Sequence, residues 1–89
     1  MEFDKFRKTV SPGDIIECIG GTEHLSYHIV VDTYTTESGS YALAAHTLYA
    51  RPAEYMKPGE LHHLYLEEFE ERNDENAVGI LYKHGNICH

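Results

Sequence analysis

The fold is decided by residues 25–50, LSYHIVVDTYT-TESGS-YALAAHTLYA. Both flanks of this segment, 25–35 and 41–50, are dense in β-branched and aromatic side chains, which favour extended backbone. A type I turn with Gly39 in the left-handed region, making a G1 bulge, suits the intervening residues 36–39 better than a two-residue primed turn. The sequence therefore predicts one long β-hairpin at the centre of the protein.

The type of turn sets the register of this hairpin, and a slip of one residue moves every side chain to the other face. With the G1 bulge, Val30 is opposite His46. His28 is then opposite Leu48, so the two histidines share one face. With a tight turn at 38–39 the two histidines lie on opposite faces. We expect the first register.

The flanking segments predict a small barrel around the hairpin. Residues 11–14 form a turn that leads into a β-branched strand at 15–19, and residues 77–83 form a last strand. Residues 1–8 and 52–56 could each form a helical turn, and Pro52 should end the second hairpin strand.

Residues 60–72 are the best helix candidate, with apolar side chains on one stripe at Leu61, Leu64, Tyr65 and Phe69. A strand at 62–66 remains the alternative. The expected fold is mostly β (α+β): a half-open SH3-like barrel with a long central hairpin and one helix near 60–72.

The size and the net charge of the chain limit the kinds of partner that it can bind. Eighty-nine residues make a single domain, 1–89, and a domain this small has little stability to spare, so a homo-oligomer is compatible with the sequence. The net charge of -8 argues against nonspecific binding to nucleic acid or to an anionic membrane. It permits a basic protein surface, a small anionic ligand or a second copy as partner. We expect a cytoplasmic protein.

The cysteines and histidines do not predict a metal site. Cys18 and Cys88 have no CxxC spacing, and we expect a buried and a terminal thiol, with a disulfide between them as the alternative. The histidine spacings do not match those of zinc ligands. No metal or cofactor is predicted.

Seven Tyr and seven His make the chain rich in side chains that both stack and form hydrogen bonds. On the hairpin they lie near small alanines, Ala42, Ala44 and Ala50, which either leave room for a flat ligand or let another element pack closely. The first interpretation predicts a site for a nucleotide-like or other planar anionic ligand, formed by Tyr27, His28, Tyr34, His46, Tyr49 and Arg51.

Residues 67–75 contain six of the fifteen acidic side chains. Such a run is typical of a solvated helix face, but it could also imitate nucleic-acid phosphates and occupy a basic groove on a partner protein. The residues predicted for that contact are Glu67, Glu68, Glu70, Glu71, Asp74 and Glu75.

Short motifs add a family resemblance. PGDIIE at 12–17 is a Pro-Gly-Asp turn opening an apolar strand, HLSYHIVV follows at 24–31, and AAH stands at 44–46. In these motifs, residues 12–47 resemble the barrel half of papain-like cysteine enzymes, in the permuted branch that includes lecithin:retinol acyltransferase-like proteins. The resemblance implies a barrel, a histidine heading the second strand and a later cysteine in an Asn-Cys context, loosely echoed by NICH at 86–89.

The resemblance also implies that the catalytic set is not intact. Ser26 holds the place of the family's histidine, between His24 and His28, and the sequence ends one residue after Cys88, without the helix that activates such a thiol. We therefore expect a non-catalytic binding module that sequesters or blocks a partner, as phage-type inhibitors do. A minimal thiol hydrolase or acyltransferase using Cys88 with His46 is the enzymatic alternative.

Overall fold

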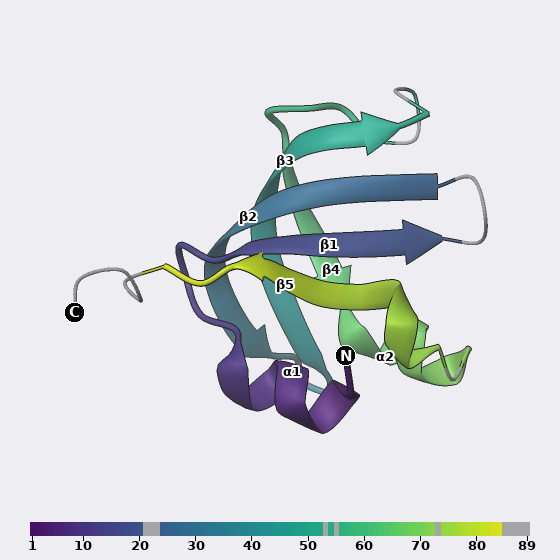
Figure 1. Cartoon of the computed structure of the whole chain (residues 1–89). Coiled ribbons are helices and arrows are strands. Elements are labelled where there is room, and N and C mark those ends of the chain that lie inside the picture. Colours follow the sequence, from purple (N-terminus) through teal and green to yellow (C-terminus); the bar gives the residue numbers. More distant parts are fainter. Residues whose placement is uncertain (21–23, 53, 55, 73, 85–89) are drawn as a thin grey trace.

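A computed structural model describes residues 1–20, 24–52, 54, 56–72 and 74–84 of the chain (Figure 1). In this part of the chain, five antiparallel strands form a sheet in the order β4-β3-β2-β1-β5. The elements along the chain are α1 (Phe3–Thr9), β1 (Ile15–Gly20), β2 (His24–Thr35), β3 (Tyr41–Arg51), β4 (Leu61–Tyr65), α2 (Leu66–Glu71), the 3-10 turn η1 (Glu75–Ala77) and β5 (Val78–Tyr82).

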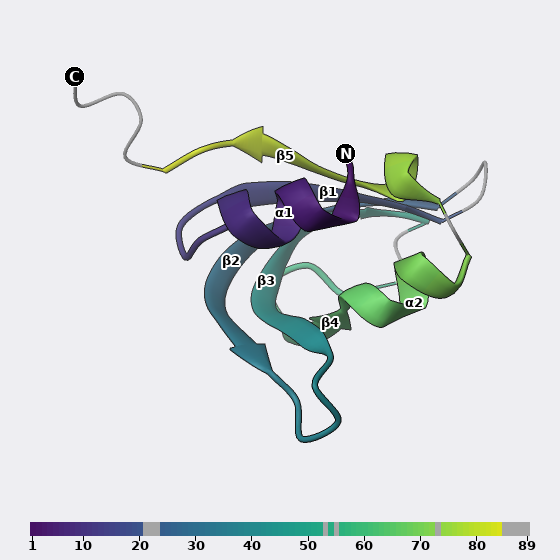
Figure 2. The same cartoon turned by 90° about the horizontal axis from the view of Figure 1, so that it is seen from below.

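The sheet curls into a half-barrel whose edge strands, β4 and β5, do not pair with each other (Figures 1 and 2). Both helices lie at one end of it, where Phe6 of α1 and Leu66 of α2 enter the core. The predicted mostly β, half-open barrel is confirmed. The buried cluster consists of Phe6, Val10, Ile16, Cys18, Val30, Leu43, Leu66 and Val78.

The hairpin turn is the predicted type I turn with a G1 bulge. The Gly39 N–H donates to the Thr36 carbonyl at 2.9 Å, and the Thr36 N–H donates to the Ser40 carbonyl at 2.8 Å. Gly39 has φ of +90°, a conformation that glycine adopts without the clash a Cβ would cause. Next to the turn, Thr35 is opposite Tyr41, as the predicted register requires.

Farther from the turn the predicted register is wrong. One bulge at Val31 shifts the pairing so that Ile29 is opposite His46 and His28 is opposite Thr47. A second irregularity, at Leu48, restores the original register beyond it. Because side chains alternate along a strand, His28 and His46 lie on opposite faces. A turn fixes the pairing only up to the first bulge.

The prediction of one helix at 60–72 is wrong in its first half and right in its second. Residues 61–65 form β4, whose backbone pairs with β3, with Leu61 opposite His46 and Leu64 opposite Leu43. The strand alternative is therefore confirmed. The apolar residues that predicted one stripe of a helix are divided between the two sides of this strand. Leu64 turns toward the core, whereas Leu61 and Tyr65 are exposed. Residues 66–71 form α2.

The remaining predictions largely hold. The N-terminal helical turn is α1, the first strand is β1, the last strand is β5, and β3 ends at Arg51 before Pro52. The predicted helical turn at 52–56 includes residues 53 and 55, which lie outside the described residues. In the part of the chain that the structure describes, no helix has the length and apolar character needed to cross a membrane.

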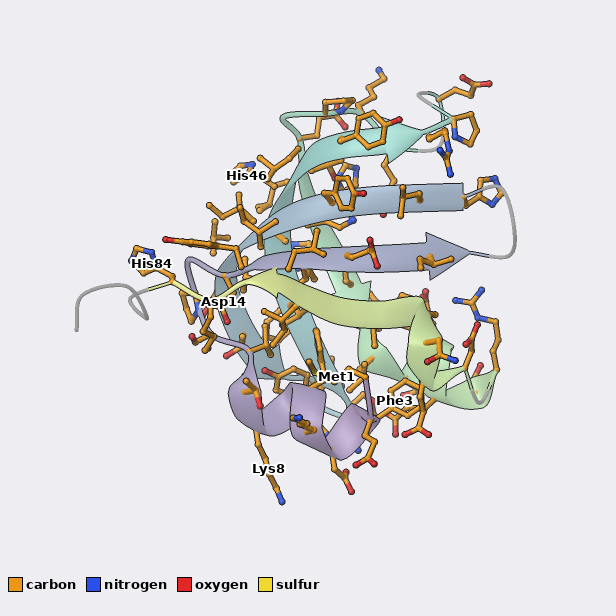
Figure 3. All side chains as sticks on the ribbon, in the orientation of Figure 1. Met1, Phe3, Lys8, Asp14, His46 and His84 are labelled. Carbon is orange, nitrogen blue, oxygen red and sulfur yellow. The ribbon has the colours of Figure 1, made fainter. Side chains whose placement is uncertain are left out.

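Asp14, directly before β1, connects the segment after α1 with the segment after β5 through hydrogen bonds. Its buried carboxylate accepts hydrogen bonds from the Ser11 N–H at 2.8 Å, from Lys83 Nζ at 2.7 Å and from the His84 N–H at 2.9 Å. Figure 3 shows Asp14 and His84 close together. Burial alone would raise the pKa of this carboxyl, but the hydrogen bonds outweigh it and hold the pKa below its usual value.

Candidate functional site

The six predicted ligand residues do not come together. Tyr27 and Tyr49 are opposite each other on the outer face of the sheet, with ring centroids 5.6 Å apart, and Arg51 lies at the end of the same strand face. His46 is also exposed on this face, where Figure 3 shows it projecting from β3, and its Nδ1 lies 3.3 Å from the Gly59 carbonyl. The outer side of the sheet therefore carries these four residues and also Tyr34, which is opposite Ala42 nearer the hairpin turn.

Tyr34 and His28 are nevertheless separated from the other four. The Tyr34 hydroxyl, near the hairpin turn, forms a hydrogen bond with His63 Nδ1 at 2.8 Å. His28 is completely buried in the half-barrel. The alanines leave no room for a ligand, since Ala42 and Ala44 are buried and pair with Tyr65 and His63 of β4.

His28 belongs instead to a chain of polar groups inside the half-barrel. Its Nε2 lies 2.8 Å from Ser26 Oγ, and its Nδ1 lies 3.1 Å from Thr47 Oγ1. The same Thr47 oxygen lies 2.9 Å from Nδ1 of His62, whose Nε2 is 3.9 Å from a carboxylate oxygen of Glu60. These five side chains connect the core to the surface.

Two opposite proton arrangements satisfy the hydrogen bonds of this chain, and the Glu60 carboxylate favours one of them. The Glu60 carboxylate favours a proton on His62 Nε2, so His62 Nδ1 accepts the Thr47 hydroxyl proton. Thr47 has only one proton, so it accepts from His28 Nδ1–H. His28 Nε2 then accepts from the Ser26 hydroxyl.

Both ring nitrogens of His28 are thus satisfied in the neutral form. Burial of the ring, with a smaller contribution from His62, lowers the pKa of His28 to about 4. His28 is therefore a neutral, hydrogen-bonded core residue near pH 7. Ser26 is buried as well, so this pair is closed to a substrate in the described structure.

Five of the six predicted acidic residues border cavities around α2. We call the side chains of Glu67, Glu68, Glu70, Glu71 and Glu75, with Glu2 and Asp4 at the start of α1, the acidic face. Three cavities border it. The first, of about 460 Å³, is lined by Arg7, Gly39, Ser40, Tyr41, Glu67, Glu70 and Glu71. The second, of about 330 Å³, includes Glu2, Asp4, Glu70 and Glu75, and the third, of about 310 Å³, includes Glu67 and Glu68.

Residues far apart in sequence build the first cavity. Ser40, beside the hairpin turn, donates a hydrogen bond to the Glu67 carboxylate. Arg7 of α1 donates to Glu70 at 3.4 Å and to Asp4 at 2.9 Å through one nitrogen. The other terminal nitrogen, Nη1, is buried and has no hydrogen-bond partner among the described residues. Asp74, the sixth predicted acidic residue, is exposed but lines none of these three cavities.

The sequence offered unequal signals for these sites. The spacing of Ser26 and His28 places them on one face of a strand, so their contact could have been anticipated. Thr47 and His62 could not, because their positions depend on the bulge at Val31. Nothing in the sequence indicated that Arg7 would line an acidic cavity.

The cysteine prediction is partly within the described residues. Cys18 is a buried free thiol, and burial, together with Glu17, raises its pKa to about 12. Such a thiol is unreactive near neutral pH. Cys88, the predicted partner of His46, lies outside the described residues.

Comparisons with protein-family models, curated proteins and solved structures give no match. The resemblance to papain-like enzymes therefore stays a prediction, and the proposals below rest on the geometry of this chain.

Proposed function

We propose that this protein is a non-catalytic binding module whose acidic face holds an arginine-rich surface of a partner protein. It would thereby block that surface for nucleic acid or another anion. The observation behind the proposal is the cavity of about 460 Å³ in which three glutamates, Glu67, Glu70 and Glu71, face a single arginine, Arg7. Among the charged groups of that cavity, negative charge is in excess.

The chemistry of the cavity suits a guanidinium group. Glu70 already contacts Arg7, whereas Glu67 and Glu71 have no ion pair described with a basic side chain, so each can accept a charged donor from a partner. An arginine side chain offers a planar fork of five donors that matches carboxylates better than an ammonium group does. The ring of Tyr41, in the same cavity, gives the guanidinium a surface for stacking.

The geometry supports this function better than the nucleotide-like ligand. A planar anion would need the stacking and hydrogen-bonding groups on one surface, but His28 is buried and Tyr34 is bonded to His63. The three cavities all border carboxylates, and carboxylates repel an anion.

A direct test compares two triple variants of equal net charge. The first, Glu67→Gln with Glu70→Gln and Glu71→Gln, removes the charges of the cavity. The control, Glu17→Gln with Asp32→Asn and Glu54→Gln, removes three charges that line none of the three cavities. Binding of a short, fluorescent arginine-rich peptide is measured by anisotropy.

We expect the cavity variant to bind the peptide about tenfold more weakly, since three exposed charge contacts of about 0.5 kcal/mol each amount to a factor of this order. The control should keep most of the affinity, and wild-type binding should weaken as salt is added. Equal losses in the two variants would show that only net charge matters, and the proposed site would be wrong.

A further inference from the structure

The outer face of the sheet is an apolar surface that no helix of the described chain covers. A row of side chains crosses all five strands, with Leu61, His46, Ile29, Ile15 and Tyr82 adjacent in register. The stacked Tyr27 and Tyr49 lie next to this row, and the bulges add Val31 and Leu48. Several of these side chains are widely exposed, including Leu48 at 49% and Tyr49 at 44%.

This face differs from the rest of the protein in charge. Among the outward-facing paired positions of its central strands, β1, β2 and β3, the fully charged side chains are Glu17, Asp32 and Arg51, two acidic and one basic. The whole chain has a net charge of -8, and its acidic face lies at α2 and α1. The surface is therefore close to neutral on a strongly acidic protein.

We infer that the outer face pairs with the outer face of a second copy of this chain. In a two-fold interface the same surface meets itself, so a charged face would repel its own copy, and a near-neutral apolar face would not. The acidic face cannot form such a contact. A basic partner, conversely, would gain little from the outer face, because its carboxylates exceed its basic side chains by only one.

The size of the face indicates a weak dimer. Five strands about 4.8 Å apart and five residues about 3.4 Å apart along each strand give a footprint on the order of 400 Å². This is well below the roughly 800 Å² per partner of a standard stable interface. Each copy also carries its own negative charge into the complex, and this repulsion opposes association.

The repulsion gives the dimer a distinctive salt dependence. Added salt screens the charge between copies and strengthens the burial of apolar surface, so dimerisation should increase with salt. The proposed binding of a basic partner should weaken with salt. The two interactions are thus separable in one titration, and the dimer does not rest on the proposed function.

Sedimentation velocity of the full chain over a range of protein and salt concentrations tests the inference. We expect monomer at low concentration and a rising dimer fraction at higher protein and higher salt. Tyr49→Glu should weaken the dimer at least tenfold. Ser38→Glu is the charge-matched control, because it adds the same negative charge at an exposed residue of the hairpin turn, outside the paired positions of the sheet.

A second variant, Leu48→Ser, separates lost contact from added repulsion. It leaves the net charge of each copy unchanged, so a weaker dimer reflects the lost apolar contact. Circular dichroism of each variant confirms the fold. A monomer under all conditions, a dimer that dissociates as salt rises, or equal effects of Tyr49→Glu and Ser38→Glu would overturn the inference.

Discussion

Mild acid should destabilise this protein through His28. The unfolded histidine takes up a proton near the ordinary histidine pKa of 6.5, whereas burial lowers the pKa of folded His28 to about 4. Between these values the unfolded state binds more protons, so stability falls as the pH falls and is fully present above about pH 6.5. From these two pKa values, the loss between about pH 7.5 and about pH 5 is roughly 2 kcal/mol, rising to about 3 kcal/mol below pH 4.

The assay is urea unfolding at the two pH values. A loss of about 2 kcal/mol is large against the roughly 5–15 kcal/mol that stabilises a typical small domain. The variant His28→Gln removes the titrating ring and should show little of this pH dependence, although it is less stable at both values. His46→Gln removes an exposed histidine of the outer face and should behave like the wild type.

Asp14 does not complicate this measurement. Its pKa is lowered from 3.8, so the stability it contributes is lost only as the pH falls below that value, outside the window used. Equal stability of the wild type at the two pH values would refute the reasoning. An undiminished pH dependence in His28→Gln would do the same.

Three other predictions concern single contacts. Asp14→Asn should cost about 2 kcal/mol in urea unfolding near neutral pH, because it leaves Lys83 without its charged partner; a cost below about 0.5 kcal/mol would contradict the role of this clamp. Gly39→Ala should cost about 1 kcal/mol because its φ is +90°, while Gly79→Ala, with no such φ and open space around its Cβ, should cost less; equal costs would contradict the turn geometry. The proton arrangement places the proton of the neutral His28 ring on Nδ1, where it is donated to Thr47, so ¹⁵N NMR should show Nδ1 protonated and Nε2 unprotonated; a proton on Nε2 would contradict the arrangement.

The part of the fold that depends on local chemistry could be predicted from the sequence. The turn at Gly39 follows from the one residue there that tolerates positive φ, and the strands follow from runs of β-branched residues. The bulge at Val31 could not be predicted, because it depends on packing across three strands. Since that bulge reverses the relation of His28 and His46, the predicted ligand site failed with it.

Residues 61–65 show a second limit of predicting structure from the sequence. Leu61, Leu64 and Tyr65 have a spacing that satisfies a helix stripe, and only the free edge of β3 decides that the chain pairs there as β4. The acidic residues could be predicted from the sequence, because a run of charged residues is recognisable without knowing the strand register. The other wall of their cavity, Arg7, Ser40 and Tyr41, comes from distant segments, and its approach to α2 is a property of the folded chain.

The most direct test of the central claim is to map where a basic partner touches the protein. Backbone amide shifts of ¹⁵N-labelled protein are followed during titration with a short arginine-rich peptide at low salt. The proposed function predicts that the changes concentrate at Arg7, Ser40, Tyr41, Glu67 and Glu71 and disappear in the cavity variant. Changes concentrated on the outer face around Tyr27 and Tyr49, or spread evenly over all exposed carboxylates, would contradict it.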